Sequence, residues 1–243
     1  MNNLQRWEMI GKIRVGRICN NIKPKYKDYT SILCLTPFTP YGSLGPYVLK
    51  DKRGRIMENI WQFSKVYEEV PYSKERYSRW DNTIIWEHPS ERHVSKNGKV
   101  LRAYYNWRKK GMYNKYPVRY PVGFSYRNKC LYSLYKKQKL DYISSRKKIY
   151  LPTYCRLVKK EPQFIELAKR LENGENLLII EVDGPHQESL SYYQQKYGVG
   201  DNFIKNNTIK INKQNIDILL NDPKHPFGHG YCLAIALLGL IEI

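Results

Sequence analysis

One short stretch of the chain carries a carboxylate, an indole, an amide and an ammonium group at helical spacing. Residues 57–67 read MENIWQFSKVY, and the four groups belong to Glu58, Trp61, Gln62 and Lys65. At 3.6 residues per turn these side chains share one face of a helix. The amide can hydrogen-bond a ligand, and an ammonium group that is partly removed from water can act as a nucleophile. The stretch therefore predicts a helix face with reactive groups.

Two interpretations of this face are open. Glu, Gln and Lys suit a solvated surface, and Glu58 falls in the first turn, where the helix dipole favours an acid. That surface explains Trp61 poorly, because exposure of an indole ring to water is unfavourable. We favour the second interpretation, in which the face lines a pocket and Trp61 stacks on a ring of the ligand.

Two further acids follow a continuous apolar run. The run LLIIEV at 177–182 predicts a buried central strand, so Glu181 and Asp183 mark its carboxyl end, where a strand holds side chains in fixed positions. Backbone donors of the Gly184–Pro185 turn explain such an acid equally well. His186 lies three residues beyond Asp183 and can protonate a leaving base.

A Gly-x-Gly pattern opens the last predicted helix. Gly230 follows His229 there, and backbone amides at a helix start can hold phosphate. His229 and Gly230 are therefore candidate substrate-binding residues. A tight turn is the alternative interpretation of the two glycines.

The order of these motifs resembles the NADAR (YbiA-like) N-glycosidase family. Glu58 with Gln four and Lys seven positions later, and an aromatic residue before the Gln, resembles the signature helix of that family. The segment 35–38 (LTPF) resembles a motif upstream of that helix, and the segment 160–181 resembles a Lys-Phe pair followed by a helix, a turn and a strand that ends in Glu. The segment 228–234 resembles a final glycine-rich helix start. The Trp-Gly pair that the family carries after this strand is replaced by 183–186 (DGPH).

The resemblance implies a single helix-rich α+β domain over residues 1–243, with a small sheet and an inserted lobe at about 75–140. It further implies a hydrolase, an N-glycosidase acting on a phosphorylated ribosylamino compound such as an early riboflavin biosynthesis intermediate, without a metal or other cofactor. Cleavage of a nitrogen–sugar bond passes through an oxocarbenium-like sugar and needs a nearby negative group. The catalytic candidates are Glu58, Lys65, Glu181 and Asp183, and the substrate-binding candidates are Trp61, Gln62, His186, His229 and Gly230.

Lys65 has two candidate roles. It can bind phosphate, or it can attack the sugar C1 to form a Schiff base. A solvated Lys65 paired with Glu68 or Glu69 is the third interpretation. We place phosphate or substrate binding first.

The charge balance widens the choice of partner. Lys and Arg number 42 against 22 Asp and Glu, a net charge of +20. A strongly basic chain attracts polyanions, and basic residues interleaved with tyrosines suit single-stranded nucleic acid. Nucleic acid is therefore a further candidate partner, either as a carrier of ADP-ribose or base to be removed or as a ligand without turnover. A coding bias toward Lys and Asn is the alternative explanation of the charge, and the abundance of Lys and Tyr throughout the chain is the alternative explanation of their interleaving.

Other patterns limit the class of protein. Five dispersed cysteines form no CxxC pair, and the five histidines have no ligand spacing, so we expect neither a disulfide framework nor a metal site. The most apolar run, 231–243, is too short to span a bilayer. Without a signal-like N-terminus, we expect a soluble cytoplasmic or intracellular protein with no membrane partner.

Periodicity and turn residues predict the elements that position these groups. We expect a small core around Trp80, Trp86 and Trp107 in the inserted lobe. We expect a loop at residues 184–200. The expected strands and helices are a strand at 12–18, a helix from Ile56 to just before Pro71, helices at 129–140 and 141–148, a helix at 161–171, a strand at 176–182, a strand then a helix over 208–220, and a helix at 231–240.

Overall fold

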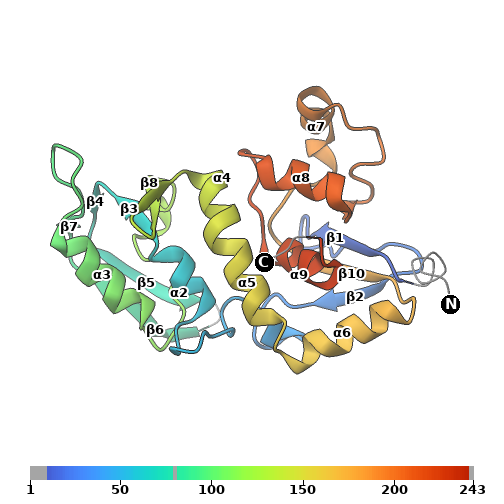
Figure 1. Cartoon of the computed structure of the whole chain (residues 1–243), viewed down its shortest axis with the longest axis horizontal. Helices are drawn as coiled ribbons and strands as arrows, with labels where there is room; N and C mark the ends of the chain where they lie inside the picture. The colour runs from blue at the N-terminus through green and yellow to red at the C-terminus, as the bar shows by residue number, and fades with distance from the viewer. Residues whose placement is uncertain (1–9, 79–80, 241–243) are drawn as a thin grey trace. The chain divides into compact units, whose positions relative to one another are not determined.

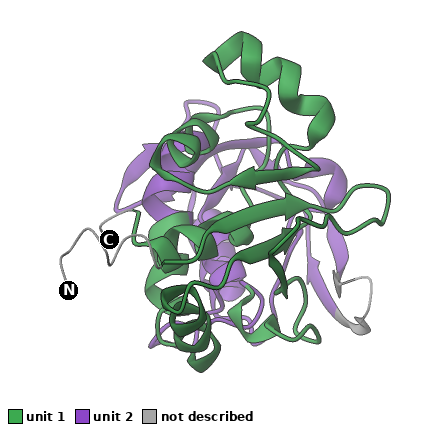
Figure 2. Ribbon diagram, turned by 90° about the vertical axis from the view of Figure 1, so that its right-hand side faces the viewer, with its two compact units in different colours: residues 1–45, 151–243 green, residues 46–150 purple. Residues whose placement is uncertain are grey.

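The computed structural model describes residues 10–78 and 81–240, and the fold is mixed α+β (Figure 1). The chain forms two compact units (Figure 2). Unit 1 comprises residues 1–45 and 151–243, and unit 2 comprises residues 46–150. Unit 2 is longer than the lobe expected at about 75–140, and it contains the 57–67 stretch. The single NADAR-like domain stays a prediction.

Unit 1 is built on a four-stranded sheet in the order β11-β1-β10-β2. Its strands are β1 (Ile13–Arg17), β2 (Thr30–Leu33), β10 (Leu177–Glu181) and β11 (Thr208–Lys210). The strand β10 runs parallel to both β1 and β2, while β11 is antiparallel to β1. Leu177 to Ile180 are fully buried, so the expected central strand is confirmed.

The described part of unit 1 also contains helices and short helical turns. They are η1 (Gly42–Leu44), α5 (Leu151–Val158), α6 (Pro162–Glu172), η4 (Gln187–Ser189), α7 (Leu190–Tyr197), α8 (Lys213–Asn221) and α9 (His229–Leu238). The apolar helix α9 packs on β1, β10 and α5. The expected helices at 161–171 and 231–240 and the strand–helix pair at 208–220 are confirmed.

The loop expected at 184–200 is wrong in its second half, where α7 forms. Tyr193 is fully buried and anchors that helix to the unit. Gly198 ends it in the left-handed conformation, with φ of 65°. The polar composition of this segment did not indicate a helix, because α7 is anchored by a buried tyrosine instead of an aliphatic stripe.

Unit 2 contains three small sheets. The order β3-β8-β9 joins β3 (Lys65–Tyr67), β8 (Cys130–Tyr135) and β9 (Gln138–Leu140), and two ribbons pair β4 (Glu69–Val70) with β7 (Glu91–Arg92) and β5 (Ser73–Ser78) with β6 (Asp81–His88). The helical elements are α2 (Met57–Gln62), α3 (Arg102–Met112), η2 (Phe124–Tyr126), α4 (Tyr142–Ser145) and η3 (Arg146–Tyr150). The expected helix at 141–148 is confirmed by α4 and η3.

The helix expected from Ile56 to just before Pro71 is wrong beyond Gln62. The Ser64 hydroxyl donates to the Trp61 carbonyl at 2.7 Å and ends α2. The chain then extends, and β3 pairs antiparallel with β8. Lys65 therefore begins a strand instead of continuing the helix face.

The helix expected at 129–140 is also wrong, because this segment is the β8–β9 hairpin. Lys136 and Lys137 form its turn, both with positive φ, 46° and 68°. Consecutive left-handed residues favour the tight hairpin turn. Burial along β8 does not alternate, since Ser133 and Leu134 are both buried, so the segment lacks the two-residue period that predicts a strand.

An aromatic core holds unit 2 together. Trp86 and Trp107 lie in it, as expected, and Trp80 lies outside the described residues. Phe63 packs against both, with ring centroids 5.1 Å and 4.6 Å apart. Phe63 immediately follows α2, so this core fixes the end of the helix that carries Glu58.

Candidate functional site

Glu58 is a buried acid on α2. Its residue exposure is 6 %, although the helical pattern placed it on the face away from the core. Its backbone amide donates to the carbonyl of Pro46 at 3.0 Å. Its Oε1 accepts a hydrogen bond from Gln62 Nε2 at 2.8 Å. The carboxylate is therefore held in one position within unit 2.

Gln62 connects Glu58 to Lys65. Its nitrogen donates to the carboxylate, and its oxygen accepts from Lys65 Nζ at 2.9 Å. The two bonds use opposite ends of one amide, so each fixes the orientation of the other. Three of the predicted site residues thus form one hydrogen-bonded chain, even though Lys65 lies on β3.

The environment of Lys65 favours loss of its proton. Burial lowers the pKa of the ammonium group, and the nearby Cys130 and Glu58 oppose this lowering only in part. Burial in turn raises the pKa of the Cys130 thiol. A lysine of this kind is a better nucleophile than a solvated one.

Trp61 lies beside the same group. Lys65 Nζ is 4.9 Å from the centroid of the Trp61 ring, which itself makes an edge contact with Tyr150 at 5.1 Å between centroids. Trp61 also covers a small apolar cluster that includes Leu140 and Ile149. Packing therefore accounts for part of this ring, which remains partly exposed.

The remaining predicted site residues lie in unit 1. Glu181, Asp183, His186, His229 and Gly230 belong to it, whereas Glu58, Trp61, Gln62 and Lys65 belong to unit 2. The predicted site residues therefore fall into two sets, one in each unit.

Glu181 is fully buried at the carboxyl end of β10. Its Oε1 accepts from the amides of Val182 and Asp183 at 2.8 Å and 3.3 Å, and its Oε2 accepts from the amide of Gly230 at 2.7 Å. The anion at the N-terminus of α9 is thus a side chain of the protein. The Gly230 amide, which we expected to hold a substrate phosphate, donates to Glu181. These contacts support the alternative interpretation of Glu181 as a buried acid that is satisfied by backbone donors.

His229 forms a buried ion pair with Glu181. Its Nδ1 lies 3.3 Å from Glu181 Oε2, and its Nε2 lies 3.0 Å from the Cys34 carbonyl. Burial alone would lower the pKa of His229, but the Glu181 carboxylate and Cys34 outweigh it and raise the pKa to about 10. The imidazole is therefore charged and donates from both nitrogens, which ties α9 to β10 and to the end of β2.

The turn after β10 is fixed by close contacts. Gly184 has a φ of 104°, and a side chain there would collide with the Tyr231 hydroxyl. The Gly184 carbonyl accepts from Arg17 at 2.6 Å. Burial raises the pKa of Tyr231, and the nearby carboxylates of Glu181 and Asp183 raise it further. His186 caps η4 instead, with Nδ1 3.6 Å from Glu188.

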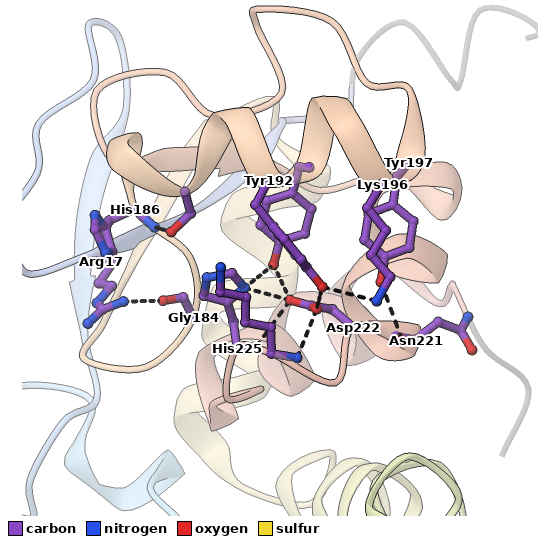
Figure 3. A network of polar contacts seen from close by, with 12 residues as sticks. Arg17, Gly184, His186, Tyr192, Lys196, Tyr197, Asn221, Asp222 and His225 are labelled. Atoms are coloured by element: carbon purple, nitrogen blue, oxygen red, sulfur yellow. Dashed lines mark hydrogen bonds and ion pairs between the residues drawn. The ribbon is translucent and has the colours of Figure 1, made fainter.

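A buried acid that the sequence interpretation missed lies between α7 and α8. Asp222 accepts from the hydroxyls of Tyr192, at 2.7 Å, and Tyr193, and from His225 Nδ1 at 2.7 Å (Figure 3). Burial raises its pKa, but these hydrogen bonds outweigh that effect and leave the pKa below its usual value. Lys196 donates to the Tyr192 hydroxyl at 3.1 Å. In the sequence, the adjacent pair Tyr192–Tyr193 is the local signal of this cluster, and Asp222 lies 29 residues after Tyr193.

Within residues 10–78 and 81–240, no group of three or more His, Cys, Asp or Glu side chains is placed to hold a metal ion. Over the same residues, every helix is too short or too polar to cross a bilayer. Comparison of the chain with protein-family models, curated proteins and solved structures finds no significant match. Membership of the NADAR family therefore stays a prediction.

Proposed function

We propose that the chain is an N-glycosidase whose reactive carboxylate is Glu58. The observation that carries the proposal is the hydrogen-bonded chain from Glu58 through Gln62 to Lys65. When a nitrogen–sugar bond breaks, positive charge develops on the sugar C1 and its ring oxygen. A buried carboxylate, held in place before the reaction, stabilises that charge more than a solvated one does.

Lys65 supports this chemistry in one of two ways. As a cation it binds a phosphate of the substrate. As a neutral amine it attacks C1, and the sugar–base bond breaks as the Nζ–C1 bond forms, with one Nζ proton passing to the leaving base. The sugar ring then opens to a Schiff base as the second Nζ proton passes to the ring oxygen, and water hydrolyses the Schiff base to free the sugar and Lys65. The lowered pKa of Lys65 favours the second role, and its bond to Gln62 suits the first.

The substrate follows from the resemblance and from the ring beside Lys65. The partly exposed Trp61 is suited to stack on a planar base, while Lys65 provides a positive charge next to it. We therefore propose a phosphorylated ribosylamino compound, such as an early riboflavin intermediate, as the small-molecule substrate.

A second candidate substrate is supported by the charge of unit 2. Residues 46–150 contain 25 Lys and Arg against 9 Asp and Glu, so they carry +16 of the net charge of +20. This concentration favours a polyanionic substrate. We propose, as the alternative, removal of ADP-ribose or of a base from nucleic acid.

The test compares Glu58→Gln with Glu69→Gln. Both remove one carboxylate from unit 2, but Glu69 is exposed on β4. Released sugar is measured with ribosylaminopyrimidine phosphates and with ADP-ribosylated oligonucleotides. Loss of one electrostatic stabiliser costs on the order of 100- to 1,000-fold in kcat, so Glu58→Gln is expected to fall by that factor and Glu69→Gln to match wild type. No release by the wild type from either substrate class would overturn the proposal.

Lys65→Arg separates the two roles of that residue. The guanidinium keeps the charge but is not a nucleophile, so phosphate binding survives and a covalent step does not. Borohydride added during turnover traps a Schiff base as a stable sugar adduct on the wild type. A trapped adduct at Lys65 identifies the covalent route, and turnover without an adduct together with an active Lys65→Arg identifies phosphate binding.

A further inference from the structure

The segment 113–127 of unit 2 is an anchored loop that carries four exposed or partly exposed rings. We call this set, Tyr113, Tyr116, Tyr120 and Phe124, the aromatic row. Tyr113, Tyr116 and Phe124 are exposed by 53 %, 38 % and 51 %, and Tyr120 between them is partly exposed. The Tyr120 and Phe124 rings make an edge contact at 5.1 Å between centroids. Large exposed rings at a spacing of three to four residues are unusual for a surface loop and indicate a binding function.

Each ring of the row has a cation beside it. Four pairs are formed, with cation-to-centroid distances of 5.9 Å for Arg55 and Tyr113, 5.0 Å for Lys115 and Tyr116, 5.1 Å for Arg119 and Tyr120, and 3.5 Å for Arg127 and Phe124. Rings that alternate with positive charges match a ligand in which planar groups alternate with negative charges. Single-stranded nucleic acid has that arrangement, because its bases are free to stack and its phosphates lie between them.

The loop between the rings is fixed to the core of unit 2. Val118 and Val122 are buried. The Val118 amide donates to Asn59 Oδ1 at 2.7 Å, and Trp86 Nε1 donates to the Pro121 carbonyl at 3.0 Å. The backbone is thereby positioned before a ligand arrives, so less ordering is needed on binding.

The surrounding charge has the sign that this ligand needs. Unit 2 carries +16 of the chain's +20. The Glu75 carboxylate lies at this loop, where it accepts from the Phe124 amide at 3.1 Å. A base stacked on a ring replaces an exposed cation–π contact, which is the weaker of the two. Arg55 is paired with Asp51 at 2.7 Å, and Arg127 donates to the Phe124 carbonyl. We therefore assign the phosphate contacts first to Lys115 and Arg119.

We propose that the aromatic row at 113–127 binds single-stranded nucleic acid by stacking bases on its rings and contacting phosphates through Lys115, Arg119 and their neighbours. Duplex fits it less well, because paired bases are stacked on each other and do not expose their faces to loop side chains. The inference goes beyond the glycosidase proposal and does not depend on Glu58.

The first test removes rings without changing charge. Fluorescence anisotropy measures binding of labelled single strands of about 12 nucleotides, as DNA and as RNA. Tyr116→Ala/Phe124→Ala is compared with Tyr72→Ala/Tyr105→Ala, which removes two exposed rings of unit 2 outside the row. We expect the first pair to weaken binding at least about tenfold and the second to leave it unchanged. Phe124→Tyr, which keeps the ring, is expected to bind like wild type.

The second test separates specific phosphate contacts from overall charge. Lys115→Ala/Arg119→Ala and Lys96→Ala/Lys99→Ala remove the same charge, and Lys96 and Lys99 are exposed at the turn before α3. Loss of two phosphate contacts lowers the slope of log affinity against log salt by about 1.4 for a single strand. We expect that change for the first pair only.

Any of these results would overturn the inference: equal affinity of the two ring variants, equal salt slopes of the two charge variants, or duplex binding as tight as single-strand binding. Heparin fragments serve as a polyanion without bases, and equal binding of heparin also contradicts base stacking. Glu58→Gln is expected to bind strands like wild type, so failure of the glycosidase proposal and failure of this one are distinguishable. Circular dichroism confirms that each variant is folded.

Discussion

The carboxylate of Glu181 and the imidazole of His229 form a buried ion pair that joins the last helix of unit 1 to its central strand. The atoms Oε2 and Nδ1 are 3.3 Å apart, and the two residues lie 48 positions apart in the chain. Because the two groups are satisfied by each other and by backbone groups of unit 1, the pair has a structural role in that unit. It also makes the stability of the protein depend on pH.

The first prediction concerns that pH dependence. The pKa of His229 rises from 6.5 to about 10 on folding, so its contribution is complete below about pH 6.5 and is lost as the pH rises through about 10. Between these values the free energy of unfolding is expected to fall by up to about 1.4 kcal/mol per pH unit from this group. Urea unfolding of wild type and His229→Gln across this range measures the difference. Parallel curves for the two proteins would contradict the pairing.

The second prediction concerns Gly111 in α3. Gly to Ala within a helix usually stabilises by up to about 1 kcal/mol. At Gly111 the added Cβ would lie 1.9 Å from Phe63 Cε1, inside the core of unit 2. We therefore expect Gly111→Ala to destabilise by about 1–3 kcal/mol, as overpacking does. Gly200→Ala, with open space around it, is the control, and thermal unfolding is the measurement.

The third prediction concerns Asn59, which is fully buried on α2. Its Nδ2 donates to the carbonyls of Asn114 and Tyr116 at 3.2 Å and 2.9 Å, and its Oδ1 accepts from Val118. Asn59→Ala leaves three backbone groups unsatisfied, which costs about 2–4 kcal/mol. Faster hydrogen exchange confined to residues 114–118 is expected first. The exposed Asn128 supplies the control variant Asn128→Ala, and unchanged exchange in Asn59→Ala would rule out this anchoring role.

The fourth prediction concerns Asp222, whose carboxylate collects two tyrosine hydroxyls and His225. Asn in its place presents one acceptor and one donor, so one tyrosine faces a donor and loses its bond. We expect Asp222→Asn to lower the free energy of unfolding by about 2–3 kcal/mol at neutral pH. Asp217→Asn, on the exposed face of α8, is expected to match wild type.

Acid adds a second readout to the Asp222 experiment. The folded pKa of Asp222 lies below its usual value of 3.8. Its contribution is therefore present above about pH 3.8 and is lost as the pH falls through the lower folded value. The difference between wild type and Asp222→Asn is expected to shrink toward low pH. A difference that stays constant down to the lowest pH would mean that packing, and not the carboxylate, causes the destabilisation.

The sequence by itself determined the elements whose signal is local. The run at 177–182 is apolar at every position up to its acid, and its short length favours a buried strand over a helix; β10 is that strand. The 3.6-residue period and the Pro at its start defined α6. The density of Trp80, Trp86 and Trp107 in one segment predicted a small core, and Trp86 and Trp107 lie in it. Burial of apolar side chains stabilises these elements, and the order of apolar residues along the chain is enough to predict it.

Tertiary contacts decided what the local pattern left open. Ile56, Ile60, Phe63 and Tyr67 fit a helix period and are all buried, yet pairing of β3 with β8, more than 60 residues away, turned the second half of that stretch into a strand. The same pairing brought Lys65 to Gln62 from a strand instead of a helix turn. Glu181 was predicted as a site residue from its position, but its partners, Gly230 and His229, are set by the packing of α9. Hydrogen bonds between distant segments carry no periodicity, so the sequence cannot show which acid is satisfied by its own chain and which is held ready for a ligand.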